Sequence, residues 1–274
     1  CNLRTGEVLA SAGMMNPQIR FGEDLMSRVS YVMMHPDGDV EMTKVIRETI
    51  NELARKVTKE ANLKLDEIVE VTVVGNPIMH HILLGISPIE LGGAPFALAT
   101  DESVRIRARD LKLNLHTNTR CYVFPCIAGH VGADTAGMIL SEAPHKREAI
   151  TLLVDIGTNA EIVLGNKERL LAASSPTGPA FEGAQITCGQ RAALGAIERV
   201  RIDKKTLEPK FKVIGCELWS DENEFSEISK KTGITGICGS GIIEAIAEMY
   251  LAGIITQDGV IDGSTAEKSK KIVK

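Results

Sequence analysis

The segment Asp155-Ile-Gly-Thr-Asn159 combines residue types that could bind a magnesium-phosphate group. Its carboxylate follows an apolar and β-branched run, 151–154, which is typical of a buried strand. Gly157 and Thr158 then form a turn whose backbone N–H groups can approach a ligand closely, and carboxylate oxygens are ligands that Mg²⁺ prefers. The same residues suit a simple β-hairpin with an aspartate in its turn, so other parts of the chain must distinguish the two.

Two further glycine-rich turns follow within about ninety residues of the first. Residues 176–183 read Pro-Thr-Gly-Pro-Ala-Phe-Glu-Gly and lead into a helix predicted near residue 184. Residues 236–241 read Gly-Ile-Cys-Gly-Ser-Gly and lead into a helix predicted over 242–252. Unpaired N–H groups and the helix dipole make such a helix start an anion site. Each turn alone is more often only a turn, but the three together favour a nucleotide site.

His130 and Asp134 lie where a short strand predicted over 121–124 gives way to a helix predicted over 131–141. Either side chain could orient a water molecule for attack on a terminal phosphate. Alternatively, Asp134 only stabilises the first helical turn through the helix dipole. The sequence contains neither a P-loop motif nor a convincing Rossmann fingerprint.

Composition excludes several classes of protein. The net charge of −5 and the pI of about 5.8 argue against a general nucleic-acid binder. No apolar run approaches the roughly 20 residues of a membrane span, so we expect no membrane association and a cytoplasmic protein. The six cysteines form no Cys-x-x-Cys pair, so no zinc ribbon or iron–sulfur cluster is expected among them. A basic patch, Arg105, Arg107 and Arg109, could dock a partner or be a solvated face.

The elements that must position these residues alternate between strands and helices, which predicts parallel α/β layers. A helix is predicted over 41–61, with Asp39 as its N-cap and an apolar stripe along one face. The run 68–74 predicts a strand buried on both faces, followed by a helix over 78–84.

Other segments complete the predicted order. A short strand is predicted over 7–12, a helix over 21–34 and an irregular insertion over about 87–118. After a polar joint come three strands in meander order, over 149–155, 160–164 and 169–173, and then polar surface strands within 199–227.

An ordered set of motifs resembles the ASKHA superfamily of acetate and sugar kinases, chaperone ATPases and actin, and more specifically the reductive activators of corrinoid proteins. The matching stretches span residues 16 to about 255. They are Asn16-Pro-Gln with Phe21-Gly-Glu-Asp24 and Ser27-Arg28; Val74-Gly-Asn-Pro-Ile-Met-His80; Pro125-Cys-Ile-Ala-Gly-His-Val-Gly-Ala-Asp134; Asp155-Ile-Gly-Thr-Asn-Ala-Glu161; Ser175-Pro-Thr-Gly-Pro-Ala-Phe-Glu-Gly183; and Gly236-Ile-Cys-Gly-Ser-Gly241.

The resemblance implies a two-lobed α/β fold of RNase H-like topology, incomplete at both ends. We expect a first lobe over 1–146 and a nucleotide-binding second lobe over 147–274. The family's first phosphate motif is expected before Cys1 and the end of its nucleotide lobe after Lys274. Its [2Fe-2S] domain is likewise expected outside this chain, which lacks the corresponding cysteines.

The resemblance also implies a function: ATP and Mg²⁺ would drive the return of an inactive cob(II)amide to cob(I)amide on a corrinoid protein. A homodimer is left open, and no nucleic-acid partner is expected. We expect Asp155 to hold magnesium through water, and Asp134 or His130 to position water. The expected nucleotide contacts are Asp155, Gly157, Thr158, Asn159, Gly178, Glu182, Gly239, Ser240 and Gly241. Two alternatives are a kinase for a small acid or sugar, and a non-catalytic scaffold.

Overall fold

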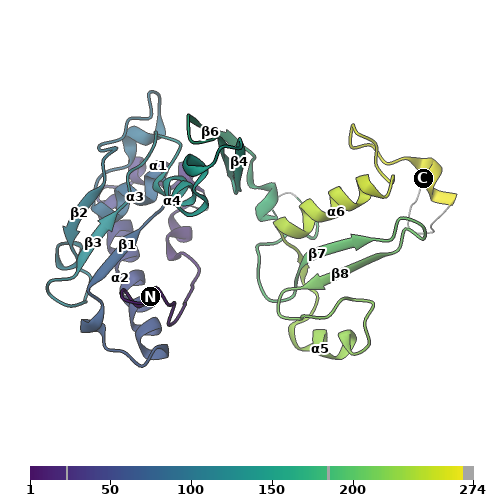
Figure 1. Ribbon diagram of the computed structural model, residues 1–274, viewed down its shortest axis with the longest axis horizontal. Coiled ribbons are helices and arrows are strands. Elements are labelled where there is room, and N and C mark those ends of the chain that lie inside the picture. Colours follow the sequence, from purple (N-terminus) through teal and green to yellow (C-terminus); the bar gives the residue numbers. More distant parts are fainter. Residues whose placement is uncertain (23, 184–185, 268–274) are drawn as a thin grey trace. The chain divides into compact units, whose positions relative to one another are not determined.

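The computed structural model of the 274-residue chain describes residues 1–22, 24–183 and 186–267 (Figure 1). The chain forms two compact units. The first comprises residues 1–155 and 161–174, and the second comprises 156–160 and 175–274. The mixture of helices and sheets confirms the predicted α/β class. The predicted lobe boundary between residues 146 and 147 stays a prediction, because the two units are defined only by how compactly their residues pack.

A three-stranded sheet with one apolar and one polar face forms the centre of the first unit. Its strands are β1 (Glu70–Val73), β2 (Val104–Arg107) and β3 (Arg120–Val123), in the order β1-β3-β2. β1 runs parallel to β3, and β2 runs antiparallel to it. Side chains alternate between faces along a strand, so Val71, Cys121 and Ile106 share the apolar face, which packs on a buried cluster.

The prediction that β1 is buried on both faces is wrong. Glu70 and Thr72 are exposed, whereas Val71 and Val73 are half-buried. The apolar and β-branched run, which only Glu70 interrupts, predicted two covered faces. Glu70 and Thr72 instead share the other face with polar side chains from β2 and β3. This open face therefore stays in contact with solvent.

The helices of the first unit are α1 (Leu25–Met34), α2 (Gly38–Glu60), α3 (Pro77–Leu84) and α4 (Ala133–Glu142). Ile50 of α2 and Leu84 of α3 pack against the cluster under the apolar face of the sheet. The apolar stripe predicted for α2 is confirmed, since Met42 is fully buried and Ile46 and Ile50 pack against the core. The predicted N-cap is wrong: Asp37 precedes the helix, and Asp39 lies in its first turn.

The N-terminal region also differs from the prediction. Residues 7–12 form no strand, since no neighbouring strand pairs with them among the described residues. The helix predicted over 21–34 begins only at Leu25, where the carboxylate of Asp24 accepts a hydrogen bond from the Ser27 N–H at 2.7 Å. A separate 3₁₀ turn, η1 (Pro17–Phe21), precedes it. The insertion contains η3 (Ile89–Gly92), β2 and η4 (Ala108–Leu111), and η2 (Leu65–Glu67) precedes β1.

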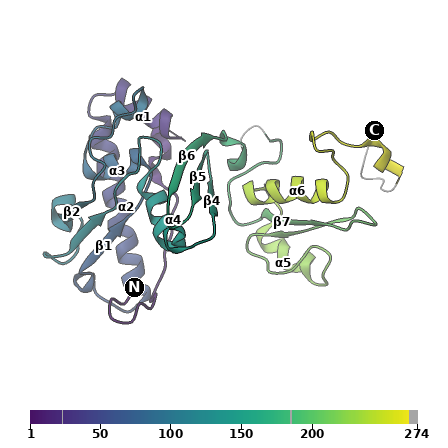
Figure 2. The same ribbon diagram turned by 45° about the horizontal axis from the view of Figure 1, so that its top comes forward.

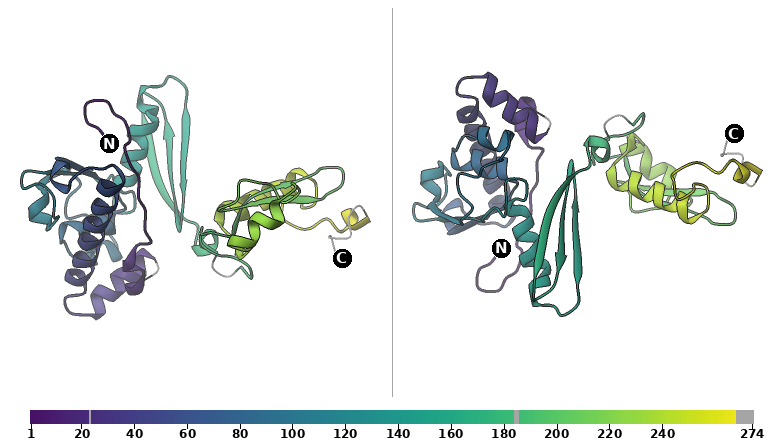
Figure 3. Two further views of the ribbon diagram at one scale, coloured as in Figure 1. Left: turned by 90° about the horizontal axis from the view of Figure 1, so that it is seen from below. Right: turned by 90° about the horizontal axis from the view of Figure 1, so that it is seen from above.

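The predicted meander is confirmed. β4 (Thr151–Ile156), β5 (Asn159–Gly165) and β6 (Leu170–Pro176) pair in the order β4-β5-β6. Their connections are far too short for parallel crossovers, so neighbouring strands are antiparallel. Helix α4 lies alongside the meander (Figure 3), and η5 (Pro144–Lys146) joins the two.

The second unit is built on β7 (Ala196–Ile202), β8 (Pro209–Val213) and β9 (Gly236–Ile237), in the order β8-β7-β9. Helices α5 (Phe225–Thr232) and α6 (Gly239–Leu251) lie on opposite sides of the β7–β8 ribbon (Figure 2). The polar strands predicted within 199–227 are confirmed for β7 and β8, but α5 begins at Phe225. Two 3₁₀ turns, η6 (Pro179–Glu182) and η7 (Gly263–Glu267), complete the unit.

The helix predicted near residue 184 starts outside the described residues. The helix predicted over 242–252 is confirmed as α6, which starts three residues earlier. Among the described residues, no helix combines the length and apolar character needed to cross a bilayer.

Candidate functional site

Three carboxylates of the first unit interact with one another at the end of β4. Asp155 lies near the end of β4, Glu161 lies on β5, and Asp134 lies in the first turn of α4. Burial raises the pKa of Asp134, and the charge of Asp155 adds to that shift. Two of the three, Asp134 and Asp155, were predicted as site residues, and this cluster brings them together.

The backbone around α4 fixes the position of Asp134. Gly132 precedes the helix, and a Cβ there would lie 2.6 Å from the Asn76 Cα, so only glycine fits this close approach. The Ala133 N–H donates to the Gly75 carbonyl at 2.9 Å, which ties the start of α4 to the chain after β1. The Asp134 Oδ1 accepts a hydrogen bond from the Thr135 N–H at 2.8 Å, which opposes the rise in its pKa.

Glu161 also belongs to the acidic cluster, although no role was predicted for it from the sequence. Burial raises its pKa, the hydroxyl of Ser174 on β6 donates to its Oε1 at 3.2 Å, and the charges of Asp134 and Asp155 raise the pKa further. Glu161 lies two residues after Asn159 on a strand, so both side chains lie on one face. This spacing was the sequence signal that Glu161 belongs to the site.

His130 lies in the exposed turn before α4. Its ring packs edge-on against Phe96, with the centroids 4.3 Å apart. The role predicted for His130, positioning water, stays a prediction.

In the second unit, the first two glycine-rich turns are hydrogen-bonded to each other. The Thr177 hydroxyl donates to the carbonyls of Gly157 and Thr158, at 2.6 and 2.9 Å. The N–H groups of Thr177 and Gly178 both donate to the Thr158 carbonyl, at 3.1 and 3.0 Å. Gly178 has φ +74° and ψ 175°, a conformation that favours glycine. The side chain of Glu182, another predicted contact, lies outside the described residues.

The third glycine-rich turn forms the start of α6, which contacts η6. Among the residues that the structure describes, no side chain caps this helix, so the N–H groups of its first turn can meet an anion. A Cβ at Gly241 would lie 2.4 Å from the Ile197 carbonyl oxygen, so this glycine permits close packing on β7. The Ser240 hydroxyl lies 3.2 Å from the Cys238 sulfur.

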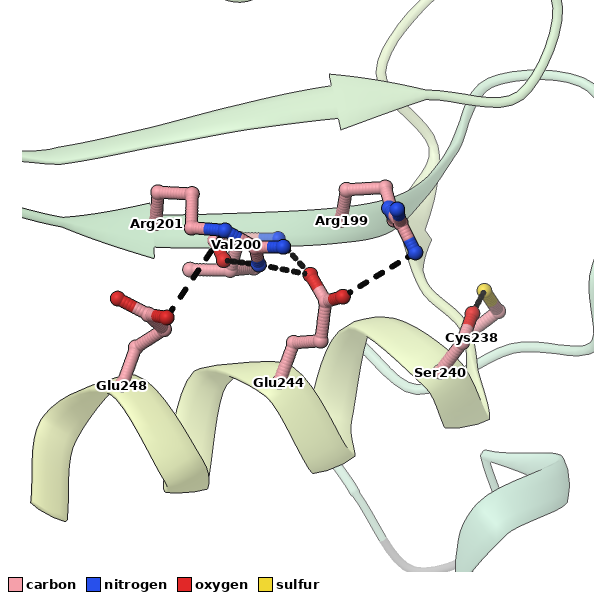
Figure 4. Close-up of polar contacts among 7 residues, drawn as sticks. All are labelled: Arg199, Val200, Arg201, Cys238, Ser240, Glu244 and Glu248. Atoms are coloured by element: carbon pink, nitrogen blue, oxygen red, sulfur yellow. Dashed lines mark hydrogen bonds and ion pairs between the residues drawn. The ribbon is translucent and has the colours of Figure 1, made fainter. Parts of the chain in front are cut away.

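Two glutamates of α6 hold the helix against β7 (Figure 4). Glu244 accepts hydrogen bonds from the Val200 N–H at 2.8 Å and from Arg201 at 2.7 Å, and it lies 3.3 Å from Arg199. Glu248 accepts a hydrogen bond from the Ile202 N–H at 3.0 Å. These contacts fix the register of α6 and therefore the place of its first turn.

The described residues fit magnesium only through water. No three His, Cys, Asp or Glu side chains among them converge closely enough to hold a metal directly. A group of mutually repelling carboxylates is nevertheless the donor set that suits a hydrated Mg²⁺.

The cysteines do not fit an iron–sulfur cluster. Cys121, Cys126, Cys216 and Cys238 are buried and free. Burial raises the pKa of the Cys126 thiol to about 11, so this thiol stays protonated at neutral pH.

Comparisons with known proteins identify similar families and relatives. A family model for the RACo middle region matches residues 1–147, and one for the C-terminal domain of RACo, the ASKHA domain, matches 149–274. The corrinoid activation enzyme RamQ of Eubacterium limosum is 34% identical over 258 residues, which is 94% of this chain and 40% of that protein.

Two further proteins are similar. A [Co(II) methylated amine-specific corrinoid protein] reductase of Methanosarcina barkeri is 28% identical over 243 residues, 82% of this chain and 44% of that protein. A solved structure of a reductive activator for corrinoid, iron-sulfur protein matches with a TM-score of 0.78 and 36% identity, covering 98% of this chain and 40% of that one. The chain thus spans about two fifths of the length of these proteins.

Proposed function

This chain belongs to the RACo family of reductive activators, and from that premise we propose that the protein uses ATP to return an inactive cob(II)amide of a corrinoid protein to cob(I)amide. The names of the relatives support the corrinoid protein as the substrate. A low-potential one-electron reduction is uphill with ordinary donors, and bound Mg-ATP would supply the free energy of phosphoanhydride hydrolysis.

The observation that carries the proposal is the carboxylate cluster next to a glycine turn. Asp155, which precedes Gly157 and Thr158 by two and three residues, would hold hydrated magnesium together with Glu161. Asp134 would orient the attacking water, because its half-buried carboxylate interacts with the charge of Asp155. Magnesium would relieve the repulsion that raises the pKa of Asp134 and Glu161.

The glycine-rich turns would bind the phosphates. Thr177 ties the turn at Gly157 to the loop at Gly178, so the backbone of both is held in a fixed conformation. The uncapped first turn of α6 offers the N–H groups of Gly239, Ser240 and Gly241. No step of this proposal is assigned to a [2Fe-2S] cluster, because the cysteines of this chain do not fit one.

Calorimetry tests the nucleotide part of the proposal. Mg-ATP titrated into the full-length protein is expected to bind, and Asp155→Ala is expected to weaken binding by about tenfold or more, because an ion-binding carboxylate is lost. The matched control is Asp101→Ala, which removes an exposed carboxylate from the first unit. Absence of binding heat with the unmodified protein would contradict both the activator hypothesis and the kinase hypothesis.

Turnover separates the activator from a kinase. ATP hydrolysis and the appearance of cob(I)amide in the visible spectrum are both expected to require the corrinoid protein and an electron donor. Phosphorylation of a small acid or sugar without any corrinoid protein would instead establish the kinase.

A further inference from the structure

The open face of the β1-β3-β2 sheet carries three arginines that the proposed ATP site does not use. Arg105 and Arg107 lie on β2, and Arg120 lies on β3. Together with Tyr122, they line an open hollow of about 720 Å³, which Glu70 and Asp110 also border. Arg109, the third member of the basic patch found in the sequence, pairs with Asp110 at 3.8 Å and does not line the hollow.

The strand register places two of these positive charges directly opposite each other. Arg107 of β2 pairs with Arg120 of β3, and Arg105 pairs with Tyr122. Like charges directly opposite across a sheet destabilise it, and a glutamate of β1 lies beside only one of them, since Glu70 pairs with Arg120. The sheet does not need this arrangement for its packing, because its core lies on the opposite face.

Neighbouring side chains orient two of the three guanidinium groups without neutralising them. Arg107 donates to the Asn118 Oδ1 at 3.0 Å, and the Arg105 guanidinium lies 5.4 Å from the centroid of the Tyr122 ring. Within the described part of the chain, no ion pair shorter than 4.0 Å includes Arg105, Arg107 or Arg120. Arg105 and Arg107 are therefore oriented, and all three arginines are available to a partner.

The surroundings favour a protein carboxylate over other anions. The chain carries a net charge of −5, and Glu70 and Asp110 border the hollow, so the positive charge is confined to three side chains. Such a small patch suits a short acidic segment, whereas a nucleic acid presents a continuous row of phosphates that needs an extended basic surface. The hollow is open rather than enclosed, whereas small-molecule sites are usually concave pockets. Planar guanidinium groups bind carboxylates in a bidentate manner. Residues two apart on a strand, such as Arg105 and Arg107, are roughly 7 Å apart, a spacing that neighbouring acidic side chains on a protein surface can match.

We infer that this arginine face docks an acidic segment on the surface of the corrinoid protein. The inference rests on the proposed function, which supplies the partner. Docking pairs the guanidinium groups with carboxylates and so relieves the repulsion between Arg107 and Arg120, which favours the complex. Such complementary charge acts mainly on the association rate and is screened by salt.

The test compares two charge reversals that lie two residues apart. In the full-length protein, Arg107→Glu is expected to weaken binding of the corrinoid protein by about tenfold or more at low salt, chiefly through slower association. Arg109→Glu makes the same change of charge outside the hollow and is expected to change affinity less than about threefold. Surface plasmon resonance at several salt concentrations measures both rates, and the wild-type salt dependence is expected to flatten in Arg107→Glu alone.

Folding and ATP binding serve as controls. Arg107→Glu places opposite charges across the strands, so its Tm is expected to equal or exceed that of the wild type. Arg120→Gln, which removes the repulsion without reversing a charge, is expected to keep Tm and to weaken binding to a smaller extent. Mg-ATP affinity is expected to stay unchanged in both variants, and a parallel loss would overturn the inference by assigning the hollow to the nucleotide.

The remaining outcomes separate this inference from the proposed function. A wild-type protein that does not bind any corrinoid protein would contradict the proposed function itself. Wild-type binding that Arg107→Glu and Arg120→Gln leave unchanged would contradict only the docking surface. Conversion of a dimer into a monomer by Arg107→Glu, seen by analytical ultracentrifugation, would make the face a contact between copies and would also overturn the inference.

Discussion

The carboxylate of Asp134 is held where its charged form is disfavoured. Burial raises its pKa, and the charge of Asp155 adds to this effect. A group whose pKa is higher in the folded than in the unfolded state favours folding at low pH, and this contribution is lost as the pH rises through the folded pKa. Without magnesium, Asp134 therefore reduces stability at neutral pH.

We predict that Asp134→Asn raises the Tm of the magnesium-free protein at pH 7 while abolishing most ATP turnover. The gain in Tm over the wild type is expected to grow as the pH rises from about 4 to 7, because only the wild-type carboxyl loses its proton. Differential scanning fluorimetry over this pH range measures the difference in Tm. The control is Glu168→Gln, which changes a carboxylate in an exposed turn. A lower Tm for Asp134→Asn at every pH would mean that the carboxylate is structural.

Gly241 matters because it lacks a side chain and so allows α6 to pack closely against neighbouring atoms. A Cβ there would lie 2.4 Å from the Ile197 carbonyl oxygen and 2.8 Å from the Ile237 Cγ1. We predict that Gly241→Ala lowers the free energy of unfolding by about 1–3 kcal/mol, the usual cost of overpacking, and weakens Mg-ATP binding by displacing the start of α6. Urea unfolding measures the loss. Gly13→Ala, which has open space around the added Cβ, is the control and should cost far less.

Individual site residues could be predicted where a local pattern marks them. Asp155 follows an apolar strand and precedes a glycine, and Asp134 begins a helix, so both stood out. Arg120 did not, because its importance depends on which strands pair. Glu161 shares a strand face with Asn159, but its contacts with Ser174 on β6 and with the charge of Asp134 on α4 depend on the fold. Arg120 is distant in sequence from Arg107, and only the β2–β3 register brings the two together.

At the scale of elements, long segments with a periodic apolar pattern could be predicted, whereas the first and last residues of each element could not. The apolar stripe of α2 repeats over several turns and correctly predicted a helix. The first residue of α2 could not be predicted, because it depends on the left-handed conformation of Asp37, which has φ 63°. The apolar run of β1 correctly predicted a strand. Its second face is open because Glu70 and Thr72 share that face with polar residues of β2 and β3. The Glu-Val-Thr-Val alternation within β1 was the signal for one exposed face.

Glu244 shows how an element can depend on one side chain. Although its partial burial favours the neutral form, the hydrogen bond from Val200 and the charges of Arg201 and Arg199 hold the pKa of Glu244 below its usual value. The Val200 residue is only 8% exposed, so losing this acceptor leaves its N–H poorly paired.

We predict that Glu244→Ala destabilises the second unit by roughly 1–3 kcal/mol, the cost of an unsatisfied buried group. Glu244→Gln keeps one acceptor oxygen and is expected to cost less. Because the folded pKa is lowered, the wild-type advantage over Glu244→Gln should be full above about pH 5 and disappear as the pH falls through the folded pKa. Equal stabilities of Glu244→Ala and wild type at pH 7 would show that α6 is held by other contacts.

At the scale of the whole molecule, the two units have separate cores of unequal size. The first unit contains a buried cluster that includes Met42 and Ile82 and a second cluster around Leu111. The second unit contains two smaller clusters, around Ile254 and around Phe225. Composition gave no sign of this inequality, because apolar residues occur throughout the chain. The meander contributes residues to both units.

This inequality leads to a prediction about unfolding. Trp219, the only tryptophan, lies in the second unit beside Arg201, Lys210 and Lys212. Its fluorescence therefore reports on the second unit alone, whereas far-UV circular dichroism reports on the helices of both. Units with separate cores need not unfold together, and the unit that buries fewer apolar side chains gains less from folding. We predict that in urea the fluorescence transition has a lower midpoint than the circular dichroism transition.

Mg-ATP should narrow the difference between these midpoints. A ligand that binds only the folded state stabilises it in proportion to the logarithm of its concentration above Kd. If the glycine turns of the second unit bind the phosphates, the fluorescence midpoint should rise with Mg-ATP, and Gly241→Ala should reduce the rise. Coincident transitions at all nucleotide concentrations would mean that the two units fold as one cooperative structure. In that case both units would have one common free energy of unfolding. A substitution that destabilises the carboxylates of the first unit or the phosphate-binding turns of the second would then weaken ATP binding to the same extent.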